Sequence, residues 1–171
     1  MASVMFSSQD QKWVFYRESF AHGVKRVSLG ASGKPEALPR SGIQGEVLGV
    51  SSTDGTSLAY VVFEVVMGMG TEKIAMLNLE SPTSPRLLDV HPQISGSAQF
   101  TPDNKAVAYP IHDNGVDNLW VQPLNGSAGH QITNFKSDKI DQFHWSPDGK
   151  KLAVLREHSE AVVVLIQETK P

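Results

Sequence analysis

Cysteine is absent from the 171 residues of this chain. Disulfide bonds and thiolate metal ligands are therefore excluded, and the cysteine count says nothing about the redox compartment. The chain also lacks a strong charge of one sign, because 15 Lys and Arg are mixed with 18 Asp and Glu, for a formal net charge of -3. Without a basic stripe to hold phosphates, we expect no nucleic-acid binding.

Long hydrophobic runs are missing as well. The most apolar stretch, residues 58–70, is shorter than the roughly 20 residues of a transmembrane helix and contains Glu64. The first residues lack the basic region and long apolar run of a signal peptide. We therefore expect no membrane insertion, and the sequence leaves the compartment open between the cytoplasm and an extracytoplasmic part of a larger protein.

The chain does contain an internal repeat. An anchor residue, a polar turn and a short apolar strand recur in this order, with anchors at Phe6, Val50, Phe100 and Trp145. The anchors are 44, 50 and 45 residues apart, close to the roughly 40–45 residues of a four-stranded propeller blade. In this alignment the unit that starts at Val50 needs one extra turn residue.

Two apolar columns follow the turns. The first contains Trp13, Leu58, Val107 and Leu152, and the second contains Val14, Ala59, Ala108 and Ala153. Small residues in the second column suit sheets that pack closely. Another strand pattern, rich in β-branched and aromatic residues, follows at 24–29, 73–79, 118–124 and 161–166. No run of 11 or more residues has a helical period, so we expect minimal helix.

These patterns predict an all-β fold: a β-propeller arc of about four antiparallel four-stranded blades. The expected blades span residues 2–43, 44–94, 95–139 and 140–171, within a single partial β-propeller domain. A weak fourth strand follows in the first three units but not in the last, where the sequence reaches Pro171 directly after the third strand. We therefore expect the last blade to lack its outer strand.

Asp54, Asp103, Asp148 and Gly149 fall in the turns between the first two strands of their units. An aspartate in such a turn hydrogen-bonds nearby backbone amides, and glycine relieves backbone strain. We interpret these residues as structural and not as catalytic carboxylates.

The best-kept unit reads Trp-Ser-Pro-Asp-Gly-Lys at 145–150, followed by Leu152 and Ala153. The third unit has Thr-Pro-Asp at 101–103 and Asn-Gly at 125–126. In these motifs the chain resembles the TolB-like, or WD-repeat-like, bacterial β-propellers, although Gln9 stands where the first turn aspartate is expected. Because such propellers usually have six or seven blades, the resemblance implies the C-terminal blades of a larger propeller.

An open arc would expose two blade faces, an apolar surface that soluble monomers rarely tolerate. We therefore expect the arc to associate with the remaining blades, with a protein partner, or with a second copy through its exposed blade edges.

Bends between the second and third strands share one end of a propeller, and loops on a rigid scaffold commonly carry recognition. The predicted binding face consists of Phe20, His22, Met67, Met69, His112, Asp113, Glu157 and His158. Equivalent histidines of different blades lie too far apart to share a zinc ion. We predict no metal site, no catalytic residue and no cofactor.

The predicted function is a non-catalytic binding or scaffold module for protein or ligand recognition. The resemblance implies that this module is a sensor or interaction part of a larger bacterial protein, such as one with a kinase domain. The alternative is the accessory propeller of a serine peptidase of the prolyl oligopeptidase kind, with the hydrolase domain elsewhere. A third possibility is a small ligand or ion bound at the propeller axis.

Overall fold

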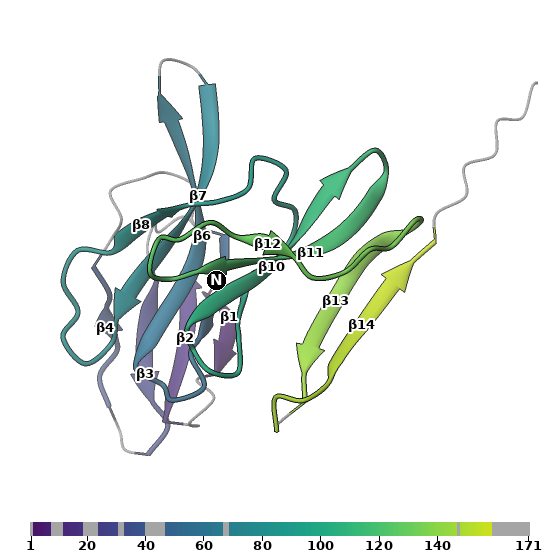
Figure 1. Cartoon of the computed structure of the whole chain (residues 1–171). Helices are drawn as coiled ribbons and strands as arrows, with labels where there is room; N and C mark the ends of the chain where they lie inside the picture. Colours follow the sequence, from purple (N-terminus) through teal and green to yellow (C-terminus); the bar gives the residue numbers. More distant parts are fainter. Residues whose placement is uncertain are drawn as a thin grey trace, which may run out of the picture.

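The computed structural model describes residues 2–7, 12–18, 24–30, 33–39, 47–66, 69–146 and 148–158. All regular secondary structure in this part of the chain is β-strand (Figure 1). No helix that could cross a bilayer occurs among these residues. The predicted all-β fold is confirmed.

Strands that follow one another in sequence pair antiparallel and form successive sheets, here called blades 1 to 4. Blade 1 consists of β1 (Ala2–Ser7), β2 (Trp13–Glu18), β3 (Lys25–Ser28) and β4 (Glu36–Ala37), and blade 2 of β5 (Val47–Ser51), β6 (Ser57–Val66), β7 (Met69–Asn78) and β8 (Arg86–Asp89). Blade 3 consists of β9 (Gln99–Phe100), β10 (Ala106–Asp113), β11 (Val116–Pro123) and β12 (His130–Gln131), and blade 4 of β13 (Lys139–Trp145) and β14 (Leu152–Glu157). The strand predicted at 161–166 lies outside the described residues.

The strand ladders correct the repeat alignment of blade 2. Leu58 pairs with Ser51, just as Val107 pairs with Phe100, and in both pairs the partners are seven residues apart. The equivalent of Phe100 is therefore Ser51 and not Val50, and the turn contains no extra residue. The repeat pattern favours Val50 because it is apolar, but the residue at this position is Ser51, which is buried.

The ladders also shift the repeat alignment of blade 1 by one residue. Val14 pairs with Ser7 at the same seven-residue separation, so Val14, and not Trp13, belongs with Leu58. In this register Asp10, which lies outside the described residues, aligns with the other turn aspartates in place of Gln9. The sequence pattern was ambiguous because Trp13 and Val14 are both apolar.

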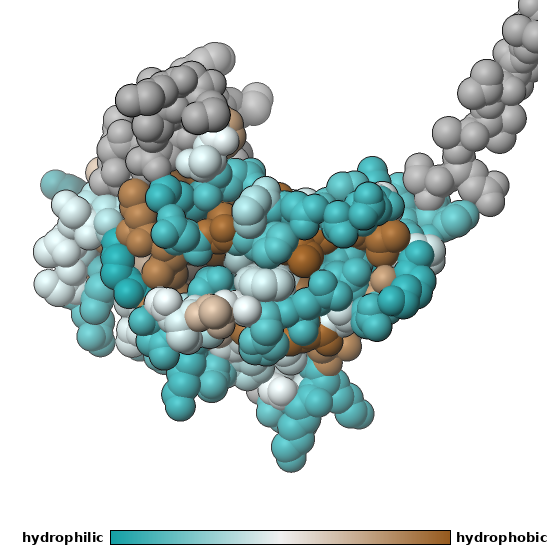
Figure 2. Space-filling model, turned by 45° about the horizontal axis from the view of Figure 1, so that its top comes forward, coloured by the Kyte–Doolittle hydropathy of each residue, from teal (hydrophilic) through white to brown (hydrophobic). Residues whose placement is uncertain are grey.

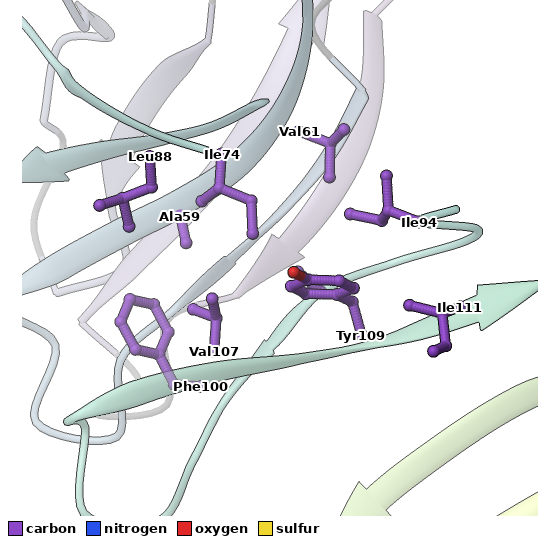
Figure 3. Close-up of a cluster of buried hydrophobic side chains, with 10 residues drawn as sticks. Ala59, Val61, Ile74, Leu88, Ile94, Phe100, Val107, Tyr109 and Ile111 are labelled. Atoms are coloured by element: carbon purple, nitrogen blue, oxygen red, sulfur yellow. The ribbon is translucent and has the colours of Figure 1, made fainter. Parts of the chain in front are cut away.

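Hydrophobic clusters lie between the blades. Phe15 of blade 1 belongs to one cluster with Leu58 and Tyr60 of blade 2. On the other face of β6, Ala59 shares a second cluster with Tyr109 of blade 3 (Figure 3). A third cluster joins blades 3 and 4. Successive strand residues thus face opposite neighbours, because side chains alternate across a sheet.

Candidate functional site

The predicted binding face lies at the end of the blades where second and third strands connect, here called the loop face (Figure 1). The tip of the β10–β11 hairpin carries His112 and Asp113, and the end of β14 carries Glu157 and His158. Met69 begins β7, and only its backbone is described. Phe20, His22 and Met67 lie outside the described residues.

His112 is paired with a buried carboxylate that the sequence reading missed. Its Nδ1 lies 2.5 Å from Oδ1 of Asp117, and Oδ2 of Asp117 accepts a hydrogen bond of 2.9 Å from the backbone N–H of Ile140. Asp117 therefore ties blade 3 to the inner strand of blade 4. A two-residue hairpin turn at Asn114 and Gly115 makes His112 and Asp117 directly opposite, which the Asn-Gly signal could have indicated.

His158 has a different partner. Its Nδ1 lies 2.5 Å from Oδ1 of Asp138, and Oδ2 of Asp138 lies 3.0 Å from Nη2 of Arg156. Hydrogen bonds from His158 and from the Ser137 hydroxyl are the main reasons why the pKa of Asp138 is lowered. The backbone carbonyl of Asp138 also accepts the N–H of Asp117, so the two histidine pairs are linked across the junction between blades 3 and 4. Asp138 has a φ of 67°, which no sequence signal predicted.

The longest hairpin projects from the loop face. Strands β6 and β7 pair over ten residues each, and Figure 1 shows their tip rising beyond the other blades. Beside the half of the hairpin nearest its turn lies a groove of about 420 Å³, here called the hairpin groove. It is lined by side chains of blade 2 and of the segment that leads to blade 3: Phe63, Thr71, Glu72, Lys73, Asp89, Val90, His91, Pro92 and Ile94, together with Gly70. Figure 2, which turns this end of the molecule forward, shows hydrophobic side chains at the surface among polar ones.

Phe63 is the large apolar side chain of this groove that remains exposed, at 43%. Its ring lies over Gly70, and a Cβ atom on Gly70 would overlap the ring, so the absence of a side chain there creates the seat for Phe63. Opposite Phe63 on β7 is Glu72, whose pKa is raised because the carboxyl is partly removed from water. Lys73 beside it forms an ion pair of 2.8 Å with Asp89. The groove thus combines an aromatic platform with a carboxylate.

A second groove follows the inner strands of blades 2, 3 and 4. Its volume is about 540 Å³, and its walls include Val50, Gln99, Asp141, Gln142 and His144. The Gln99 amide donates to the carbonyl of Phe143 at 2.5 Å and lies 3.3 Å from Nδ1 of His144. We call this the axial groove, since it lies along the strands nearest the propeller axis.

The turn aspartates lie at the opposite end of the blades. Oδ1 of Asp103 accepts hydrogen bonds from the Thr101 hydroxyl at 2.7 Å and from the N–H of Lys105 at 3.1 Å. Asp54 and Asp148 make the corresponding contacts within their own turns. In all three aspartates the hydroxyl hydrogen bond is the largest cause of a lowered pKa. The turns also meet one another, since the N–H of Thr53 donates to the Asn104 side chain at 2.9 Å.

Within the described residues, no three His, Asp or Glu side chains gather closely enough to hold a metal ion.

Solved structures similar to this chain are β-propellers. TolB from Acinetobacter baumannii matches 90% of the chain with a TM-score of 0.69 at 20% identity. A prolyl endopeptidase matches 91% with a TM-score of 0.60 at 15% identity, and Kuenenia stuttgartiensis hydrazine synthase matches 86% with a TM-score of 0.62 at 16% identity. No protein-family model matches the sequence, and no curated protein sequence is significantly similar to it. The resemblance to TolB-like β-propellers is confirmed at the level of the fold.

The matched region is only a part of each of these proteins. The chain spans 37% of the TolB chain, 26% of the prolyl endopeptidase and 47% of the hydrazine synthase chain. The fold described here is therefore a partial propeller.

Proposed function

We propose that this part of a TolB-like β-propeller is a non-catalytic recognition module that binds a protein segment on its loop face. The observation that carries the proposal is the hairpin groove, where Phe63 is 43% exposed and its ring is seated over Gly70. An aromatic side chain held in place costs little conformational entropy when a partner packs on it. Rigid aromatic anchors of this kind carry much of the energy of protein interfaces.

The chemistry of the groove specifies the partner segment. Phe63, Pro92 and Ile94 provide apolar contact for one large apolar side chain. Glu72, whose carboxyl is partly desolvated, would gain from a cation of the partner, because an opposite charge favours its ionised form. The expected ligand is therefore a segment with an apolar side chain next to a Lys or Arg.

Selection of random peptides on the immobilised protein, followed by binding measurements on the selected peptides, tests this proposal. We expect F63S to weaken binding by about tenfold or more, as for a central interface residue, and E72Q to weaken preferentially the peptides that carry a basic residue. The control is L29S, since Leu29 is 54% exposed but follows β3 at the opposite end of blade 1. Peptides that bind F63S and wild type equally well would refute the proposal.

The axial groove supports a second candidate function, the binding of a small polar ligand. Gln99, Asp141 and His144 offer both donors and acceptors around its 540 Å³. A ligand panel screened by melting temperature, with Q99L as the comparison variant, separates this candidate from the first, since Gln99 does not line the hairpin groove.

The accessory propeller of a serine peptidase stays an alternative hypothesis. It requires a hydrolase domain in the same protein, and the structural likeness to a prolyl endopeptidase concerns the fold alone. Detection of peptidase activity in a longer form of the protein would support it over the recognition module.

A further inference from the structure

The two end faces of the arc are the two halves of a junction that already occurs inside the chain. On β10, Val107 and Tyr109 face blade 2, where they share a cluster with Ala59 and Val61 of β6 (Figure 3). Tyr109 is completely buried there, and its hydroxyl accepts the N–H of His91 at 3.0 Å. The junction thus places a large side chain of one blade against a small one of the preceding blade.

Blade 1 presents the large half of this junction outward. With the corrected register, Val14 and Tyr16 correspond to Val107 and Tyr109. Phe15, between them, is completely buried against blade 2, so alternation along the strand directs Val14 and Tyr16 to the opposite face. Both side chains are only partly buried.

Blade 4 presents the small half. Leu152 and Val154 pack toward blade 3, whereas Ala153 and Leu155 alternate with them and face away. Ala153 corresponds to Ala59 in register, and Leu155 is 58% exposed. The contrast with β10, where residues 106–111 are buried on both faces, shows what a covering blade would do for β14.

We propose that a second copy of this chain covers these faces head to tail, so that Val14 and Tyr16 of one copy pack on Ala153 and Leu155 of the other. The occupant is argued from complementarity, because the chain itself carries both halves of a junction that it already forms internally. Two copies related in this way make the same head-to-tail contact twice. Repeated head-to-tail contacts give a closed ring when the rotation between copies returns to the starting copy. Two arcs of about four blades give about eight, within the 4–8 blades typical of propellers. This inference is independent of the hairpin groove.

The oligomeric state provides the first test. We expect sedimentation equilibrium to show a dimer, and L155E and Y16A each to raise the dimer dissociation constant by about tenfold or more. Leu155 is exposed within one copy, so L155E should leave the circular dichroism spectrum unchanged. L87S, which alters an exposed leucine on the outer strand β8 of blade 2 and so away from both end faces, is the control.

Cross-linking then tests the head-to-tail arrangement. The chain has no cysteine, so single-cysteine variants V14C and A153C can be joined by a short bismaleimide without background. We expect cross-links only when the two variants are mixed, since their internal equivalents, Val107 and Ala59, share one cluster.

Three results would overturn the proposal. A folded monomer at high concentration would show that a second copy does not cover these faces, and would leave further blades of a longer protein as the occupant to test. Cross-links within A153C alone would show a symmetric contact between identical faces. A dimer that L155E and Y16A both leave intact would show that the contact lies elsewhere.

Discussion

Gly149 lies in a repeated turn and next to the turn of blade 3. Its replacement by alanine should therefore destabilise the fold in two ways, through the backbone conformation and through packing. The residue has a φ of 69°, a left-handed conformation that costs a non-glycine residue roughly 1–2 kcal/mol. A Cβ atom here would also lie 2.7 Å from Cβ and 3.0 Å from Cγ of Pro102 in the turn of blade 3. Overpacking of this kind adds about 1–3 kcal/mol, so G149A should lower the free energy of unfolding by about 2–5 kcal/mol.

Gly126 is the matched control for this prediction. Its φ is 86°, but no atom lies within 4 Å of a Cβ placed on it, so G126A should cost only the backbone term of roughly 1–2 kcal/mol. Urea unfolding followed by circular dichroism measures both variants. A double-mutant cycle with P102G, which removes both Pro102 atoms that the new Cβ would meet, should recover the difference, because the two residues are in contact. Equal destabilisation by G149A and G126A would refute the inference that these turns pack together.

Three further predictions concern carboxylates. D117A should lower the free energy of unfolding by about 1–3 kcal/mol in urea titrations, because the N–H of Ile140 loses its acceptor, whereas D117N should cost less; equal costs would contradict this role. The pKa of Asp103 is lowered from 3.8, mainly by the Thr101 hydroxyl, so the stabilisation from its carboxylate is present above pH 3.8 and is lost as pH falls through the folded-state pKa. D103N should therefore reduce the loss of unfolding free energy at acidic pH, and an unchanged loss would count against this role. The pKa of Glu72 is raised from 4.5 by desolvation, so the contribution of its protonated form to stability is lost as pH rises through the folded-state pKa. E72Q should remove this part of the difference in melting temperature between pH 4 and pH 7. A difference that persists unchanged in E72Q would point to other groups.

Much of the architecture was predictable because it rests on local signals. The Ser-Pro-Asp-Gly motif at 146–149 and its relative at 101–104 specify turns through hydroxyl and carboxylate chemistry that acts within a few residues, with Gly149 or Asn104 in the left-handed conformation. The apolar strands that follow, such as residues 106–111, have a composition that favours pleated sheets. Repetition of the signals then indicated the number of blades in the chain.

Register was less predictable. Moving a strand by one residue exchanges its two faces, and in blade 1 both choices place an apolar residue, Trp13 or Val14, in the column. Only the pairing of Val14 with Ser7 decides between them. The same decision determines that Tyr16 faces outward, on which the head-to-tail proposal depends.

Some features of the candidate sites were also predictable from the sequence, and others were not. His112 and Asp113 could be placed on the loop face from their position in the repeat, and an Asn-Gly turn signals the neighbourhood of Asp117. The seat of Phe63 over Gly70 could not be foreseen, because it depends on the ring crossing to the neighbouring strand. The groove beside it needs a wall from residues 90–94, which the long connection between blades brings back to the hairpin.

The sequence by itself determined that this protein is all β-strand, that its unit is a four-stranded blade, and where the turns between first and second strands lie, because these properties depend on neighbouring residues and on a period along the chain. The tertiary structure alone decided which face of each strand is buried, which carboxylates pair with His112 and His158, and where grooves remain. These properties depend on how one blade packs against the next, and that contact joins residues about a blade length apart in the sequence.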